Sequence, residues 1–175
     1  MPIDSVRVIS NTATGETGIL LAKKFAQQGC KVTLLLGPTG TPCLPPEIKL
    51  KRFSFFDELN ILLKKELRQD YDILIQAAAV SDFAPKSYAP KKISSQCKKL
   101  KLVLNPTVKI INCLRKAKPN AFLVGFKFEP NLKAGRLIKK TRNLIKSANL
   151  DLAVGNSLLK QRFDQRFNKR YSAYL

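Results

Sequence analysis

Hydrophobic and polar positions follow two periods along the chain, one typical of buried strands and one typical of amphipathic helices. Apolar residues are concentrated in four segments that predict strands: Lys31–Leu36, Asp72–Ala77, Ala121–Phe128 and Asp151–Val154. A helical spacing of apolar residues predicts three helices: Gly18–Gln28, Asp57–Gln69 and Leu132–Ala148. Strands and helices therefore alternate along the chain.

Weaker patterns add further elements. Lys99–Leu104 alternates polar and apolar residues, as an edge strand does, and Arg170–Leu175 predicts a last strand. Asn105 and Pro106 are residue types favoured at a helix cap and at the first helical position, so they predict a helix that runs to about Lys116.

The order of these elements predicts the fold class. Alternating strands and helices favour one α/β domain over residues 1–175, with a Rossmann-like three-layer fold and a mainly parallel sheet. In such folds the ligand site lies beyond the carboxyl ends of the strands. The long segment Ala78–Ser95 follows a predicted strand and is rich in Pro, Ser and Lys, so we expect a functional loop there.

Composition and charge narrow the function classes. The 175 residues are 45% hydrophobic, enough for a packed core, which excludes a disordered chain. We find no apolar run of membrane-spanning length and no secretory leader, so we expect a soluble cytoplasmic protein without a membrane partner. The 32 Lys and Arg against 12 Asp and Glu give a net charge of +20, which suits anionic ligands.

Histidine and cysteine usage limits the possible chemistry. The sequence has no His, which excludes Ser-His-Asp and Cys-His nucleophile systems and removes the commonest metal ligand. We interpret the four cysteines as reduced structural residues, because they are widely separated: Cys30, Cys43, Cys97 and Cys113. Catalysis would therefore depend on charge and on positioning.

Several polar residues are candidates for a site near the predicted strand ends. Thr14–Gly18 contains two glycines ahead of a helix, and it could bind an anion or simply turn the chain tightly. Asn11 is either a ligand contact or a helix cap. Asp82 follows the small residues Ala77–Ala79, where a ligand could approach the backbone, although a solvated loop aspartate is the simpler interpretation.

Basic and aromatic candidates also have two interpretations each. Lysines of the long loop could clamp a phosphate or carboxylate, or only face water: Lys86, Lys91 and Lys92. Three basic residues share one face of a predicted helix and could converge on an anion: Lys139, Arg142 and Lys146. Phe126 could stack on a base next to the close backbone of Gly125, or be an ordinary buried aromatic residue.

An ordered set of motifs covers nearly the whole chain. The motifs are Pro2–Arg7, Ile9–Asn11, Thr14–Gly18, Val32–Pro38, Ala78–Phe83, Lys92–Ser95, Asn105-Pro106, Gly125–Lys127 and Asp151–Asn156. In this order they resemble the phosphopantothenate–cysteine ligase family of coenzyme A biosynthesis. Ser94-Ser95 stands where bifunctional members have further lysines, so the chain resembles the monofunctional type.

The resemblance implies a ligation in two half-reactions. The carboxylate of 4′-phosphopantothenate attacks the α-phosphate of CTP or ATP, and the amine of L-cysteine then displaces the nucleotide. The implied contacts are Asn11, Thr14 and Gly15 to the substrate or acyl-nucleotidylate, Asp82 to the nucleotide or its Mg²⁺, and Lys92 to the phosphates and the second half-reaction. The implied nucleotide site also includes Ala78, Ala79, Asn105, Pro106 and Phe126, with Arg142 and Lys146 as substitutes for the family's triphosphate lysines.

The chain also departs from the family pattern. Members usually have an apolar strand and a Gly-Gly-Thr turn before the motif that starts at Pro2, so the resemblance implies that a first strand is missing and that the amino terminus is truncated. Thr107 stands where an acidic residue is common. The family's flavin-dependent decarboxylase domain is missing, so no flavin is expected, and the family implies a homodimer.

Two other function classes remain open from the residues alone. A basic α/β protein that binds nucleic acid would suit the net charge and the basic stretches Lys98–Lys101 and Arg162–Arg170, although no recognised RNA- or DNA-binding motif is present. A dinucleotide-dependent oxidoreductase is disfavoured, because the chain has no GxGxxG motif and no suitably placed acidic residue after Lys31–Leu36.

Overall fold

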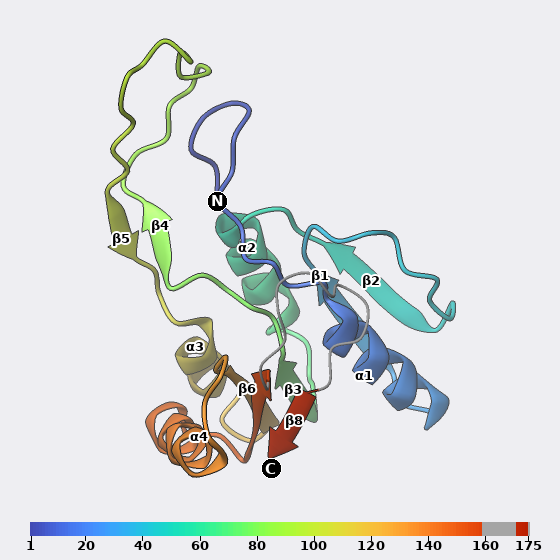
Figure 1. Ribbon diagram of the computed structural model, residues 1–175. Coiled ribbons are helices and arrows are strands. Elements are labelled where there is room, and N and C mark those ends of the chain that lie inside the picture. The colour runs from blue at the N-terminus through green and yellow to red at the C-terminus, as the bar shows by residue number, and fades with distance from the viewer. Residues whose placement is uncertain (159–170, 175) are drawn as a thin grey trace. The chain divides into compact units, whose positions relative to one another are not determined.

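A computed structural model describes residues 1–158 and 171–174, which fall into two compact units (Figure 1). The first unit contains Met1–Glu66 and Ala78–Lys109, and the second contains Leu67–Ala77 and Ile110–Leu175. The chain therefore passes from the first unit to the second and back before it enters the second unit again.

The first unit has a small parallel sheet with a helix on it. Strand β1 (Val32–Leu36) pairs in parallel with β2 (Ile48–Arg52), and helix α1 (Glu16–Gln27) packs against β1. Helix α2 (Phe56–Glu66) follows β2. The buried apolar residues of these elements are Ala22, Leu36, Ile48 and Leu59.

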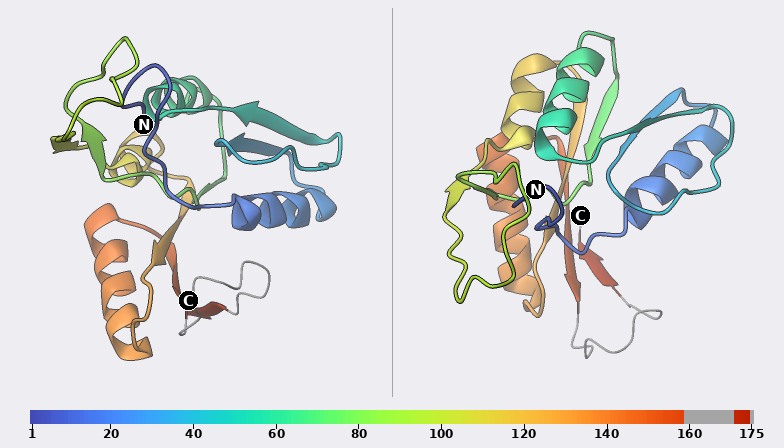
Figure 2. Two further views of the ribbon diagram at one scale, coloured as in Figure 1. Left: turned by 45° about the horizontal axis from the view of Figure 1, so that its top comes forward. Right: turned by 90° about the horizontal axis from the view of Figure 1, so that it is seen from above.

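An arm extends the first unit. Its base is the antiparallel pair β4 (Phe83–Pro85) and β5 (Leu104–Pro106), and the chain between these strands forms a long loop. Figure 2 shows the N-terminal segment beside this loop, where Asp4 forms a parallel bridge with Ala89. The arm therefore carries the lysines of the predicted functional loop.

The second unit is a four-stranded sheet in the order β3-β6-β7-β8. Strands β3 (Ile73–Gln76), β6 (Phe122–Phe128) and β7 (Leu152–Leu158) are parallel, and β8 (Tyr171–Tyr174) is antiparallel to β7. Helices α3 (Ile110–Ala117) and α4 (Ala134–Ala148) pack on this sheet. The core of the unit is formed by Leu114, Leu123, Val124, Leu137 and Ala153.

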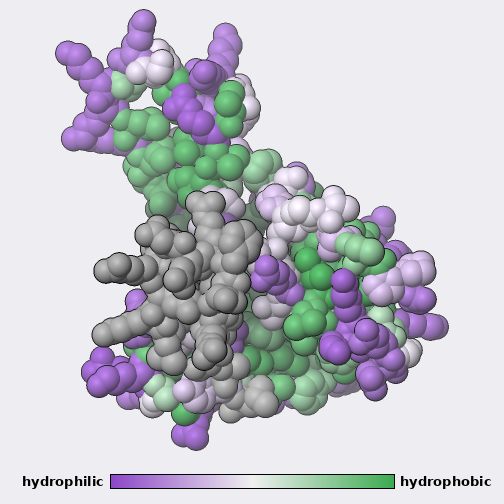
Figure 3. All heavy atoms as spheres, turned by 45° about the vertical axis from the view of Figure 1, so that its right-hand side comes forward, coloured by the Kyte–Doolittle hydropathy of each residue, from purple (hydrophilic) through white to green (hydrophobic). Residues whose placement is uncertain are grey.

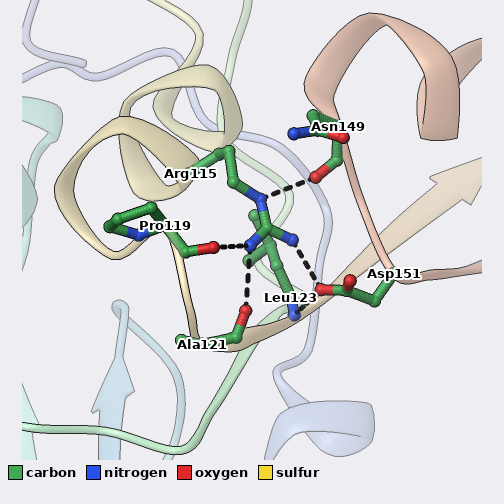
Figure 4. Close-up of polar contacts among 6 residues, drawn as sticks. All are labelled: Arg115, Pro119, Ala121, Leu123, Asn149 and Asp151. Carbon is green, nitrogen blue, oxygen red and sulfur yellow. Dashed lines mark hydrogen bonds and ion pairs between the residues drawn. The ribbon is translucent and has the colours of Figure 1, made fainter.

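A polar network joins the helix ends of the second unit to its strands (Figure 4). The guanidinium group of Arg115 donates to the carbonyl oxygens of Asn149 (2.7 Å), Pro119 (2.7 Å) and Ala121 (3.0 Å). It also pairs with the carboxylate of Asp151, which accepts the N–H of Leu123 at 2.7 Å. One side chain thus satisfies carbonyl groups that follow α3 and α4.

The α/β class with mainly parallel strands is confirmed, because three of the five strand pairs in the described residues are parallel. The four apolar strand segments and the three helices predicted from periodicity are present, with ends shifted by a few residues. The predicted last strand corresponds to β8. The single domain over residues 1–175 stays a prediction.

Two predictions in the middle of the chain are wrong. Asn105 and Pro106 do not start a helix, because they pair with Ala84 and Phe83 in an antiparallel ladder, and α3 begins only at Ile110. The predicted edge strand is also wrong, since only Leu104 of that segment lies in a strand. Strand β2 was not predicted, although its alternating lysines and apolar residues are typical of a strand with one exposed face.

Within residues 1–158 and 171–174, no helix is long and apolar enough to cross a membrane. The basic stretch Arg162–Arg170 lies outside the described residues. Lys98–Lys101 is exposed in the loop of the arm.

Candidate functional site

Asn11 and Ala79, both predicted site residues, lie in direct contact. The Nδ2 group of Asn11 donates to the carbonyl oxygen of Ala79 at 2.7 Å, and both residues are exposed. Ala79 follows the end of β3 by three residues, and its exposed neighbour Ala78 has the same small side chain. The small, exposed side chains suit a close approach of a ligand to the backbone, and a ligand contact here stays a prediction.

A threonine holds the backbone of Asp82 at the start of the arm. The carbonyl oxygen of Asp82 accepts the N–H of Thr107 at 2.9 Å, and the Thr107 hydroxyl donates to the carbonyl of Ser81 at 2.7 Å. Asp82 therefore lies next to the β4–β5 ladder that contains Asn105 and Pro106, all three being exposed. In sequence Thr107 is only a departure from the family pattern, whereas in the structure it fixes the backbone of Asp82, a candidate ligand.

Gly15 makes a tight turn before α1. Its φ angle of +76° is one that side-chain-bearing residues rarely adopt, and an added Cβ would lie 2.9 Å from Leu36. The Oγ1 of Thr14 lies 3.4 Å from the N–H of Glu16. These observations support the tight-turn interpretation, and the N–H groups at the start of a helix remain suited to an anion.

Lys92 is exposed in the loop of the arm, with Lys86 and Lys91. The residue after it, Ile93, donates its N–H to the buried carboxylate of Asp4 at 3.1 Å. Asp4 stands in a family motif, but its neighbours in sequence indicate no role for it, because its loop partner is 89 positions away.

Several polar groups converge on the Asp4 carboxylate. Burial opposes its ionisation, but the N–H groups of Val6, Ile93 and Arg7, with the charge of Arg7, outweigh that effect and lower its pKa from the ordinary value. The carboxylate is therefore ionised at neutral pH.

The second unit holds the remaining predicted site residues. Phe126 lies half-buried in β6, opposite Val154, so the structure leaves it partly available for stacking. Gly125 is required by packing, because an added Cβ would lie 2.5 Å from Leu150 and 2.8 Å from Ile111. Close packing against Leu150 and Ile111 therefore explains the glycine at this position, without a ligand next to its backbone.

The basic face of α4 is exposed at Arg142 and Lys146. On the same helix, Lys140 forms an ion pair of 2.8 Å with Glu129, which Lys127 also contacts at 3.1 Å. Hydrogen bonds from Lys140 and then Lys127 lower the pKa of Glu129. Glu129 thus neutralises Lys127 and Lys140 locally, whereas Arg142 and Lys146 have no salt bridge within residues 1–158 and 171–174.

Metal-binding groups are sparse in the described residues. Within 1–158 and 171–174, no three His, Cys, Asp or Glu side chains lie close enough to hold a metal, and the four cysteines are free and exposed. The cysteines are therefore unpaired, as predicted, but they are not core residues. Mg²⁺ is often held by one or two carboxylates together with substrate phosphates, and the exposed Asp82 suits that mode.

The chain is similar over most of its length to proteins of one family. The profile of the DNA/pantothenate metabolism flavoprotein C-terminal domain matches residues 1–173. The "Coenzyme A biosynthesis bifunctional protein CoaBC" of Thermococcus kodakarensis is 37% identical over 89% of this chain and 38% of its own length. A second protein of that name, from Methanocaldococcus jannaschii, is 34% identical over 97% of this chain and 41% of its own.

A solved structure of this family has a similar fold. The DNA/pantothenate metabolism flavoprotein of Streptococcus pneumoniae superposes with a TM-score of 0.81 and 25% identity, over 98% of this chain and 86% of that one. The chain spans about two fifths of the length of the curated relatives named above. It belongs to the DNA/pantothenate metabolism flavoprotein C-terminal domain family.

Proposed function

We propose that this chain joins 4′-phosphopantothenate to L-cysteine, with CTP or ATP as the activating co-substrate, in coenzyme A biosynthesis. The observation that carries the proposal is the contact between Asn11 and Ala79, since it brings two residues of separate predicted motifs to one place at a strand end. The family match over residues 1–173 and the names of the CoaBC relatives support the same reaction. The proposed products are phosphopantothenoylcysteine, a nucleoside monophosphate and pyrophosphate.

In the first half-reaction the substrate carboxylate forms a bond to the α-phosphorus of the nucleotide, and pyrophosphate leaves. Asn11 holds the pantothenate part, and the N–H groups after Thr14 and Gly15 bind its phosphate. Asp82 binds the nucleotide through Mg²⁺, which when bound would neutralise charge on the phosphates. Ala78, Ala79, Asn105 and Pro106 of the first unit line the nucleotide site.

In the second half-reaction the cysteine amine attacks the acyl carbon, and the nucleoside monophosphate leaves with its electron pair. Negative charge develops on the tetrahedral intermediate and on the leaving phosphate, so a fixed cation lowers the barrier without a histidine. Lys92 supplies that charge from the loop of the arm. Phe126, Arg142 and Lys146 of the second unit stay predictions from the resemblance.

The arm also supports a homodimer. Figure 3 shows hydrophobic residues below a hydrophilic tip, and the arm exposes Phe83 (53%), Leu104 (44%) and Val103 (63%). Exposed apolar patches on soluble proteins often mark interfaces. We expect Val103→Asp to reduce the molar mass measured by light scattering from dimer to monomer, and Ile61→Asp, at a 66% exposed site on α2, to leave it unchanged.

The reaction can be tested with purified protein, phosphopantothenate and either nucleotide. We expect pyrophosphate release that depends on phosphopantothenate, and a product of the mass of phosphopantothenoylcysteine when cysteine is added. Asn11→Ala should lower this rate, whereas Asn112→Ala, at an exposed position on α3, should not. The absence of pyrophosphate and product from folded protein with both nucleotides would refute the proposal. Tight binding of RNA at physiological salt would instead favour the nucleic-acid alternative.

A further inference from the structure

The first nine residues form a closed turn around one aspartate. The backbone of Ile3 donates to Arg7 at 2.9 Å, and that of Ile9 donates to Met1 at 2.8 Å. At the tip of the turn, Oδ1 of Asp4 accepts the N–H groups of Val6 (2.9 Å) and Arg7 (2.8 Å). One carboxylate oxygen thus holds the turn itself together.

The other oxygen of Asp4 holds the distant loop. Oδ2 accepts the N–H of Ile93 at 3.1 Å and lies 3.3 Å from Nε of Arg7, whose Nη2 donates to the carbonyl of Ile93. Both backbone groups of Ile93 are therefore bound by the Asp4–Arg7 pair. Lys91 and Lys92 lie between Ile93 and Ala89 in sequence. The N–H of Ala89 donates to the carbonyl of Ile3 at 3.0 Å.

The turn therefore fixes the backbone on both sides of Lys92 and leaves its side chain exposed. The Asp4 side chain has no exposed surface, so its hydrogen bonds form out of contact with water, where charge-assisted bonds are strongest. A short segment then leads from this turn to Asn11, which contacts Ala79. The same N-terminal segment thus touches both the lysine loop and Ala79.

We propose that Asp4 is a positioning residue for ligation: together with Arg7 it fixes the backbone of Lys92 relative to Asn11, so that both side chains act on one bound substrate. This inference rests on the proposed function, because the role of Lys92 does. Neither Asp4 nor Arg7 needs to touch the substrate.

Asp4→Asn is the variant that separates the two halves of this network. An amide has only one acceptor oxygen, so it can serve the turn or the loop but not both. The turn presents the N–H groups of both Val6 and Arg7, so we expect the oxygen to remain there and the NH₂ group to face Ile93. The turn should persist while the loop is released.

Amide hydrogen exchange by NMR on the full chain tests the contact without any substrate. In Asp4→Asn we expect the Ile93 amide to exchange roughly tenfold faster or more, the scale of a lost charge-assisted hydrogen bond, while the amides of Val6 and Arg7 change little. Asp57→Asn, at an exposed position in the first turn of α2, is the matched control and should change none of the three. Unchanged exchange at Ile93 overturns the proposal, whatever the activity.

Kinetics test the consequence. Asp4→Asn should lower kcat for ligation roughly 10- to 100-fold with KM for phosphopantothenate nearly unchanged, because alignment is lost and binding is not. Asp4→Asn combined with Lys92→Gln should be no slower than Lys92→Gln alone, whereas independent effects that multiply would overturn the positioning role. An inactive parent protein would refute the proposed function, and with it the role in ligation, while the exchange result would still report the contact.

Discussion

Two aspartate–arginine pairs have the same chemistry in different parts of the molecule. Asp4 with Arg7 lies in the first unit, and Asp151 with Arg115 lies in the second. In each pair the carboxylate accepts a backbone N–H from a distant residue, and the guanidinium group also donates to backbone carbonyls. Hydrogen bonds lower the pKa of both carboxyl groups.

The two pairs differ in what they hold. Arg115 and Asp151 join the ends of α3 and α4 to β6 and β7, next to the buried residues Ala121 and Leu123 (Figure 4). Asp4 and Arg7 join a terminal turn to a loop of exposed lysines. The same chemistry therefore stabilises the fold in one place and fixes the geometry of a loop in the other.

The largest effect should come from the lysine that the first pair positions. Lys92→Gln should raise the barrier to ligation by roughly 2 to 4 kcal/mol, as expected for one preorganised electrostatic contact, with a change in stability below about 0.5 kcal/mol. Steady-state ligation rates and urea denaturation measure the two quantities. Lys64→Gln, at an exposed position on α2, is the control. A parental ligation rate would show that Lys92 has no role, and Lys86 or Lys91 would be the next candidates.

The pair of Arg115 and Asp151 should contribute more to stability than the pair of Arg7 and Asp4. Arg115→Ala removes four hydrogen bonds from a side chain that is 15% exposed, so we expect the free energy of unfolding to fall by roughly 2 to 4 kcal/mol. Arg7→Ala, at a side chain that is 38% exposed, should cost less than about 1 kcal/mol. Urea denaturation measures both losses, and equal losses in the two variants would show that the two pairs contribute equally to stability.

Asp82 is a third aspartate with a different environment, because its backbone is held by Thr107 while its carboxylate is exposed. Asp82→Asn should weaken nucleotide binding roughly tenfold by removing an anionic oxygen that suits Mg²⁺, and high Mg²⁺ should partly restore it. Calorimetric titration across Mg²⁺ concentrations measures the effect. Identical curves for parent and variant would mean that Asp82 is only a loop residue.

The smallest effect concerns pH. Asp4 and Asp151 have lowered pKa values in the folded chain, below the ordinary value of 3.8, so each contributes stability that is present above that value. That contribution is lost as the pH falls through the folded pKa. Urea denaturation between neutral pH and about pH 2.5 should therefore show a smaller acid-dependent loss in Asp151→Asn than in the parent. An unchanged acid dependence would contradict the ion pair.

The sequence predicted those helices and strands whose residue pattern is continuous along the chain. The apolar runs that form β1 and β6 and the periodic residues of α4 are continuous in sequence, so their type follows from a short window. At Asn105 and Pro106 the local helix-start signal was overridden by pairing with β4, a contact across about twenty residues that no short window contains.

The candidate site was predictable only in part for the same reason. Asn11, Asp82 and Lys92 stand in recognisable motifs, so the resemblance identified them. The roles of Asp4 and Thr107 arise from hydrogen bonds to residues 89 and 25 or 26 positions away, and neither has a local signature. Such supporting residues become visible only when the chain is folded.

The proposed ligation passes through an acyl-nucleotidylate: the substrate carboxylate attacks the α-phosphate, and cysteine then displaces the nucleotide. The most direct measurement uses phosphopantothenate with ¹⁸O in its carboxylate, followed by mass spectrometry of all products. An acyl-nucleotidylate pathway places one ¹⁸O in the nucleoside monophosphate and none in pyrophosphate, because the bridging oxygen leaves with the nucleotide when the amide forms. Appearance of the label in inorganic phosphate, together with a nucleoside diphosphate, would instead show an acyl-phosphate pathway and refute the acyl-nucleotidylate.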